Sequence, residues 1–343
     1  MKAIVLWCVA AAASSQTEST QQVSLKPLVT ITEAHSEIPN VLLFSPSGTS
    51  LLSAASDGSV KLWEVPSGKM LKSLSGHKDV ITSAEFTPDG KQIFTSSWDG
   101  SVRKWEVGSG RQAAVSEHYR RVFSLKLIPG NNTLIAGLDE DVAVLGTSTL
   151  KEARRFRVDC LIKDKFGNPT LGLHCLATAK DGKKLAMGGT VSEIKIWDTK
   201  TMKELLSLKA TTPSPRDRAT VDRVLKDLAF SPDGKTLASC GNDTVIRLWD
   251  VNSGKELRCL TGHNDDVGQV SFAPSGKLLF SAGRTLRFWN VTDGGEVPVS
   301  VQGIPRVDTF ACSPDGTILA VAGDVARSIT LMTIGVATVT SEK

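Results

Sequence analysis

Two groups of side chains near the start of the chain have the residue types of a nucleophilic catalytic site. Each group holds a histidine, a hydroxyl residue, an aspartate and a tryptophan in the same frame. The two sets are His35, Ser53, Asp57 and Trp63, and His77, Thr95, Asp99 and Trp105. A hydroxyl, an imidazole and a carboxylate can form a catalytic triad. The indole N–H of the tryptophan can cap the hydroxyl, however, and the frame repeats as structure would, so we expect structural hydrogen-bond networks and no catalysis.

The elements that position these side chains are short strands joined by tight turns, and residues 230–263 show the unit most clearly. The turn Ser-Pro-Asp-Gly at 231–234 joins two antiparallel strands, because proline presets φ and glycine supplies positive φ. The runs 236–240, 245–249 and 256–260 follow as strands, each preceded by further turn residues. We therefore expect one unit to be a four-stranded antiparallel meander.

The unit recurs at a spacing of about 40 residues, apart from two longer steps. Its frame begins at Phe44, Phe86, Leu127, Thr178, Phe230, Phe272 and Cys312. The third-strand motifs are KLWEV at 61–65, RKWEV at 103–107, KIWDT at 195–199, RLWDV at 247–251 and RFWNV at 287–291, with Gly-His at 76–77 and 262–263. Through these motifs the sequence closely resembles the WD-repeat family over residues 27–334.

The resemblance implies an all-β fold, a seven-bladed β-propeller of four-stranded antiparallel blades around a central channel. The repeats are framed at about 35–74, 75–116, 117–157, 158–208, 209–260, 261–301 and 302–343. In the family a leading strand completes the last blade, so we expect residues 28–31 to pair with 328–333 and close the ring. The tail 336–340 could compete for the same place.

In the family, the four residue types of the two sets are hydrogen-bonding positions within a blade. Later repeats lose some of them. The third repeat keeps His118 and Asp139 but has Ile135 and Leu145 in place of the hydroxyl and the tryptophan. We expect that blade to depend on apolar packing alone, since packing between neighbouring repeats supplies most of the stability.

Partner contacts in this family usually come from the start of each inner strand and from the residue before the turn aspartate. Carried over by position, the predicted partner-binding residues are Trp98, Phe123, Arg121, His174, Lys226, Asp266, Arg306 and Asp308. A turn position should expose Trp98, and an exposed tryptophan with Phe and Arg nearby is typical of an interaction hot spot. The alternative is an indole that lies flat on a neighbouring loop.

These residues predict a non-catalytic scaffold, a monomeric ring that binds a protein partner of unknown identity. The alternative function is a small-molecule-binding or hydrolytic propeller, which would need His174, Asp266 and Asp308 to form a tight cluster in the channel. We expect no metal and no cofactor, because no Cys-x-x-Cys pair and no Gly-rich phosphate loop occurs.

The first 20 residues do not fit a blade. A lysine at position 2, an apolar run over 3–13 and small residues around 11–14 are typical of a secretory signal cleaved near Ala13. The run is too short to span a bilayer. We expect export to the periplasm or the medium, and the alternative is a cytoplasmic protein with an apolar N-terminus.

Composition gives no indication of a nucleic-acid partner. The 343-residue chain has a net charge of only +4, and acidic residues interrupt or flank its basic clusters. Two insertions, 159–172 and 209–223, account for the long steps between repeats. Long adjacent loops on one face can hold a ligand, or they can be neutral growth of the surface.

Overall fold

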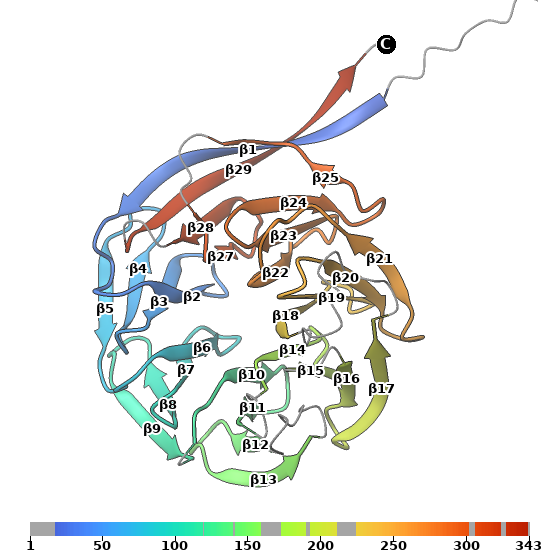
Figure 1. Cartoon of the computed structure of the whole chain (residues 1–343). Coiled ribbons are helices and arrows are strands. Elements are labelled where there is room, and N and C mark those ends of the chain that lie inside the picture. Colours follow the sequence, from blue (N-terminus) through green and yellow to red (C-terminus); the bar gives the residue numbers. More distant parts are fainter. Residues whose placement is uncertain are drawn as a thin grey trace, which may run out of the picture.

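The computed structural model describes residues 18–118, 120–139, 141–158, 173–189, 193–210, 224–301, 306–323 and 327–341. All regular secondary structure in this part of the chain is β-strand. The strands form seven sheets that stand as blades around a central axis (Figure 1). Six sheets have four strands and one has five. The fold is thus the seven-bladed all-β propeller that the repeats predicted.

Each blade runs from an inner strand beside the axis to an outer strand at the rim. Blades 1 to 3 are β2 (Pro39–Phe44), β3 (Ser50–Ala55), β4 (Val60–Glu64) and β5 (Met70–Leu74); β6 (Ile81–Phe86), β7 (Gln92–Ser97), β8 (Ser101–Glu106) and β9 (Gln112–Glu117); and β10 (Ser124–Ile128), β11 (Thr133–Gly137), β12 (Asp141–Gly146) and β13 (Glu152–Arg157). Blades 4 to 6 are β14 (Cys175–Thr178), β15 (Lys184–Gly188), β16 (Glu193–Asp198) and β17 (Lys203–Lys209); β18 (Leu225–Phe230), β19 (Thr236–Gly241), β20 (Ile246–Asp250) and β21 (Glu256–Leu260); and β22 (Gln269–Phe272), β23 (Leu278–Ala282), β24 (Leu286–Asn290) and β25 (Glu296–Val297). Blade 7 comprises β27 (Thr309–Cys312), β28 (Ile318–Ala322), β29 (Ile329–Ser341), β1 (Glu18–Ile31) and β26 (Val299–Val301).

Blade 5 shows why the repeat sequence folds as a meander. β18 ends at Phe230, and the N–H of Ser231 donates to the carbonyl oxygen of Thr236 at 2.8 Å. Gly234 has a φ of +69°, which glycine adopts without a steric cost. The hydroxyl of Ser231 donates to Asp233 Oδ1 at 2.6 Å and fixes the turn from within. The strands expected at 236–240, 245–249 and 256–260 are β19, β20 and β21.

The blades pack face to face, and third-strand tryptophans fill the layers between them. Trp105 of blade 2 packs in one cluster with Leu62 and Leu74 of blade 1. Trp249 of blade 5 packs in the same way with Leu208 of blade 4. Both indoles are 1% exposed, and burying a ring of this size contributes about 4–6 kcal/mol. Apolar packing between blades therefore holds the ring together.

Both ends of the described chain close the ring. β1 pairs with β29 antiparallel, with Ile31 opposite Ile329 and Val29 opposite Leu331, which confirms the predicted pairing of 28–31 with 328–333. The tail 336–340 does not compete for that place. It continues β29 and pairs with the earlier part of β1, where Val336 lies opposite Val23. Both segments fit because β1 is 14 residues long, and Figure 1 shows β1 and β29 extending together past the rim.

Blade 7 also gains a strand that the sequence did not predict. β26 pairs with β1 in parallel, with Val23 opposite Val299 and Leu25 opposite Val301. Most of the predicted signal segment 1–20 lies outside the described residues, and β1 begins within it at Glu18. The insertion 159–172 and residues 211–223 of the second insertion also lie outside them. The described residues include no apolar helix long enough to cross a membrane.

Candidate functional site

One face of the ring collects the predicted partner-binding residues. In a four-stranded blade, the turn between the second and third strands lies on the same face as the connection to the next blade. We call this the top face. Trp98 and Asp99 lie in the turn between β7 and β8, and His77 lies in the connection from β5 to β6. The histidine sets therefore lie at this face.

In blade 2 the four predicted residues form a continuous chain of hydrogen bonds. The indole N–H of Trp105 donates to Thr95 Oγ1 at 2.9 Å, and Thr95 Oγ1 lies 2.7 Å from His77 Nε2. His77 Nδ1 lies 2.9 Å from Asp99 Oδ2. Burial lowers the pKa of His77. Burial alone would raise the pKa of Asp99, but hydrogen bonds from His77 and Ser101 hold it well below its usual range.

Blade 1 differs from this chain in that a serine hydroxyl joins the histidine to the aspartate. His35 Nδ1 lies 3.8 Å from Asp57 Oδ1 but only 2.6 Å from Ser59 Oγ, which donates to Asp57 at 2.6 Å. The other imidazole nitrogen lies 2.6 Å from Ser53 Oγ, which accepts from Trp63 at 2.7 Å. Burial lowers the pKa of His35 to about 4.

The buried hydroxyls of the two sets cannot act as nucleophiles. Ser53 and Thr95 have no exposed surface, so no substrate reaches them. Each hydroxyl already bridges an indole and an imidazole. The geometry is that of a structural network within the blade.

Arginines that the sequence reasoning overlooked take part in the other sets. In blade 3, where apolar packing alone was expected, Arg155 Nη2 lies 3.2 Å from His118 Nδ1. Nε2 of this histidine is buried without a partner among the described residues, because Ile135 stands where a hydroxyl would be. In blade 5, which lacks the histidine, Arg247 donates to Asp243 at 2.6 Å. The sequence signal that could have predicted this pair is a basic residue on a strand that follows a turn aspartate.

Trp98 is the exposed tryptophan among the described residues. The residue is 37% exposed, and its backbone N–H donates to the carbonyl oxygen of Val80 at 3.0 Å, which fixes the turn. The guanidinium carbon of Arg121, in the connection from β9 to β10, lies over the indole ring at 4.8 Å from its centroid. The ring thus contacts a neighbouring connection and still keeps part of its surface open.

The other six predicted partner-binding residues also lie in pairs. Phe123 meets His174 edge-on with 5.2 Å between ring centroids, Lys226 Nζ donates to Asp266 Oδ2 at 2.9 Å, and Arg306 Nε donates to Asp308 Oδ1 at 2.8 Å. Burial, followed by the charge of Lys226, lowers the pKa of His174. The two ion pairs and the aromatic pair therefore carry no net charge at neutral pH.

The pairs leave no cluster for chemistry. His174, Asp266 and Asp308 do not form a cluster of three; Lys226 is paired with Asp266, and Arg306 with Asp308. No group of three His, Cys, Asp or Glu side chains that could hold a metal ion occurs in the part of the chain that the structure describes. The arrangement expected of a hydrolytic channel is thus not found among these residues.

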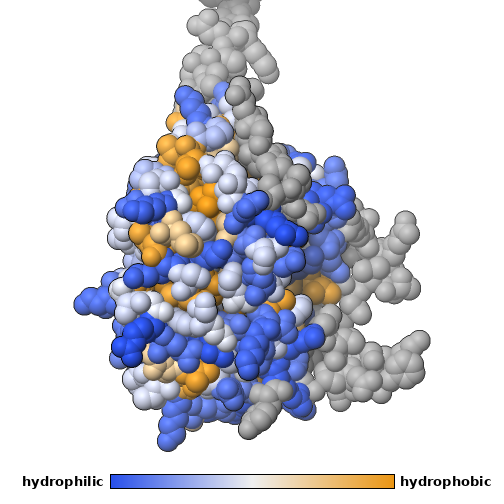
Figure 2. All heavy atoms as spheres, turned by 90° about the vertical axis from the view of Figure 1, so that its left-hand side faces the viewer, coloured by the Kyte–Doolittle hydropathy of each residue, from blue (hydrophilic) through white to orange (hydrophobic). Residues whose placement is uncertain are grey.

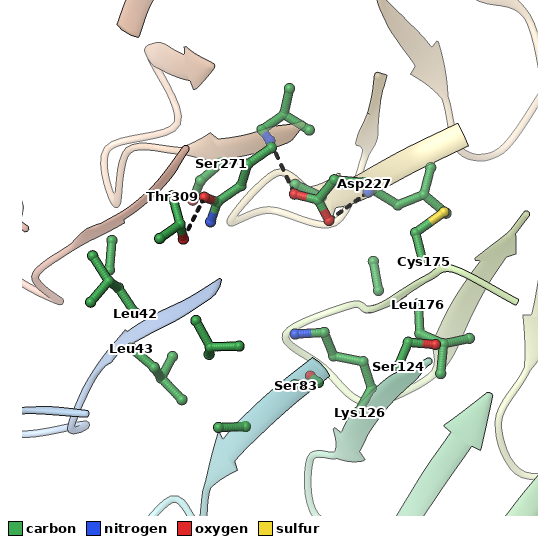
Figure 3. Close-up of a pocket in the computed structure, with 18 of the residues that line it drawn as sticks. Leu42, Leu43, Ser83, Ser124, Lys126, Cys175, Leu176, Asp227, Ser271 and Thr309 are labelled. Carbon is green, nitrogen blue, oxygen red and sulfur yellow. Dashed lines mark hydrogen bonds between the residues drawn. The ribbon is translucent and has the colours of Figure 1, made fainter. Parts of the chain in front are cut away.

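The central channel, about 600 Å³ in volume, contains three charged groups that the sequence reasoning missed. Lys126 and Asp227 reach into it from different blades (Figure 3). Lys126 Nζ donates to Glu85 Oε1 at 2.5 Å. Asp227 accepts from the backbone N–H groups of Leu228 at 2.8 Å and Val270 at 3.0 Å, so it ties blade 5 to blade 6. Burial raises the pKa of Asp227 to about 6.

Comparison with known families agrees with the repeat frame. The family described as "WD domain, G-beta repeat" matches residues 25–64, 68–106, 220–250 and 254–290. These segments include the third-strand tryptophans of blades 1, 2, 5 and 6. They are also the blades in which that indole donates to a buried hydroxyl.

Several curated proteins are similar to part of the chain. Protein groucho of Drosophila melanogaster is 28% identical over 143 residues, 41% of this chain and 18% of that protein. Transducin-like enhancer protein 2 of Mus musculus is 27% identical over 143 residues, 41% of this chain and 17% of that protein. Nuclear distribution protein nudF 1 of Talaromyces marneffei is 38% identical over 125 residues, 36% of this chain and 26% of that protein. The matched part therefore spans about a quarter or less of each relative.

Proposed function

This chain is a WD-repeat propeller, and we propose that it is a non-catalytic scaffold that binds a protein partner through the top face around Trp98. The observation that carries the proposal is the 37% exposure of Trp98, whose turn is fixed by its hydrogen bond to Val80. An indole supplies a large contact area and few rotatable bonds, so its burial by a partner entails a small ordering cost.

The surroundings of Trp98 support this role. Arg121 lies over the ring and limits its motion before a partner arrives. Phe123, two positions farther along the same connection, and His174, just before β14, provide a second aromatic surface that lines the channel. Tryptophan and arginine together are the residue types that dominate binding energy at protein interfaces.

The test is affinity capture from native extract with the wild-type chain and Trp98→Ala. Met70→Ala is the matched control, because Met70 is an exposed apolar side chain, 52% accessible, on the outer strand β5. The melting temperatures of the three proteins are compared first. We expect partners that the wild type and Met70→Ala retain and Trp98→Ala loses. If Trp98→Ala retains every partner of the wild type, the proposed site is wrong.

We also propose that the protein is exported, on the basis of residues 1–20 alone. Cleavage near Ala13 would leave β1 intact, since this strand begins at Glu18. Mass spectrometry of the N-terminal peptide from the native source tests the proposal. A mature N-terminus close to residue 14 would support export, and retention of Met1 and Lys2 in the accumulated protein would argue for the cytoplasmic alternative.

A further inference from the structure

Arg121 differs from the other charged residues in the predicted partner-binding set. Lys226 and Arg306 each donate to a carboxylate of the same set, at 2.9 and 2.8 Å. Arg121 is exposed, and its guanidinium lies over the Trp98 ring. No acidic side chain among the described residues lies within ion-pair distance of it.

The position of Arg121 prepares it for one particular kind of ligand. A guanidinium that lies over an aromatic ring is weakly hydrated, and its N–H groups remain available as hydrogen-bond donors. These donors form a planar fork that fits the two oxygens of a carboxylate. Because the ring restrains the arginine beforehand, less side-chain entropy is lost when the carboxylate binds.

We infer that the partner of the top face presents an acidic peptide segment, in which an Asp or Glu carboxylate binds Arg121 while an adjacent apolar side chain packs on Trp98. The inference rests on the proposed scaffold function and specifies its ligand. A carboxylate is favoured over a phosphate because proteins bind phosphorylated segments through clusters of arginines. At this site a single guanidinium, that of Arg121, lies over the Trp98 ring.

The experiment selects ligands without knowing the natural partner. A library of random peptides displayed on phage is panned against the immobilised full chain and against Trp98→Ala, Arg121→Gln and Arg121→Glu. Arg111→Gln is the matched control, because Arg111 is also exposed but follows β8 in the turn to the outer strand β9. A selected peptide is then measured by fluorescence polarisation beside copies that carry Asn or Gln, or phosphoserine, at its acidic position.

We expect the wild type and Arg111→Gln to select peptides with an acidic residue next to an apolar one. The amide copy should bind the wild type about tenfold more weakly than the acidic peptide does, because it loses a charge-assisted pair. On Arg121→Gln the amide copy and the acidic peptide should bind about equally well. Arg121→Glu should select basic peptides instead.

Three outcomes would overturn the inference in different ways. In the first outcome, the selected peptides depend on Trp98 but show no preference for an acidic residue. Alternatively, replacing the acid by its amide weakens binding to Arg121→Gln as much as it weakens binding to the wild type. In either case the scaffold function stands and the carboxylate inference fails. If the phosphoserine copy binds more than about tenfold tighter than the acidic peptide, the ligand is a phosphate. If no selected peptide depends on Trp98 or Arg121, both the inference and the proposed site are wrong.

Discussion

Replacing Thr95 by valine tests the hydrogen-bond network of blade 2 directly. Valine keeps the shape of threonine but removes the hydroxyl, which accepts from Trp105 at 2.9 Å and bonds to His77 at 2.7 Å. Thr95 is fully buried, so water cannot replace the lost partner. A buried polar group left without a partner costs about 1–3 kcal/mol. With the indole N–H and the imidazole Nε2 both left unpaired, Thr95→Val should lower the free energy of unfolding by about 2–6 kcal/mol.

Urea unfolding followed by tryptophan fluorescence measures this loss. Thr95→Ser keeps the hydroxyl, as Ser53 does in blade 1, and should retain most of the stability. Thr133→Val is the matched control, because its hydroxyl bonds only to an exposed carbonyl oxygen of Asn131 at 2.7 Å, and we expect a change within about 0.5 kcal/mol. If Thr95→Val loses no more stability than Thr133→Val, the network does not stabilise the blade and the reasoning is refuted.

Burial lowers the pKa of His35 and of His263 to about 4. In the unfolded chain a histidine takes up a proton near pH 6.5, whereas these two histidines in the folded chain do so only near pH 4. The free energy of unfolding should therefore fall as the pH is lowered from about 6.5 to 4, by up to about 3 kcal/mol for each histidine. A urea-unfolding profile that stays flat over this range would contradict the prediction. Burial raises the pKa of Asp227 from 3.8 to about 6, so its carboxyl group is neutral in the folded chain at low pH and must ionise while buried as the pH rises through 6. The free energy of unfolding should therefore be highest below pH 3.8 and should fall as the pH rises to 6 and above. As the pH rises from 4 to 8, Asp227→Asn should therefore become more stable relative to the wild type, by up to about 3 kcal/mol in the free energy of unfolding. If the urea-unfolding profiles of the two proteins stay parallel over this range, burial of the Asp227 charge does not destabilise the fold. Gly323→Ala should lower the melting temperature strongly, because a Cβ atom there would overlap the carbonyl oxygen of Arg306; an unchanged melting curve would show that the backbone can yield.

Local sequence predicted the blades because each strand and turn depends on a few adjacent residues. The Ser-Pro-Asp-Gly turn at 231–234 bonds within itself, and the strands are only five or six residues long, as in β19 and β20. The histidine frame was readable for the same reason, since its members recur at fixed positions in blades 1 and 2. The use of Ser59 as a bridge between His35 and Asp57 was not readable, because it depends on the distance between imidazole and carboxylate, which is 3.8 Å in blade 1 and 2.9 Å between His77 and Asp99 in blade 2.

The candidate site was predictable as a set of positions and not as an arrangement. The repeat frame placed all eight residues on one face, but three of the four pairs join residues from different strands or connections, and only Arg306 and Asp308 are near neighbours in the chain. Arg121 reaches Trp98 across the boundary between blades 2 and 3, and Lys226 reaches Asp266 across that between blades 5 and 6. Which charges cancel is set by these distances, and no spacing along the chain encodes them.

The sequence by itself determined the repeat, the turns and the positions of the polar sets, because these follow from short-range periodicity. The closing pair of strands was predicted from the family resemblance, with the tail 336–340 as an alternative. Only the tertiary structure decided three other features. The long β1 accommodates both predicted segments of β29, Asp227 and Lys126 share one channel, and Arg121 is left without a carboxylate partner in the described chain. Each of these depends on where separate blades meet around the ring, and that geometry exists only after all seven have packed together.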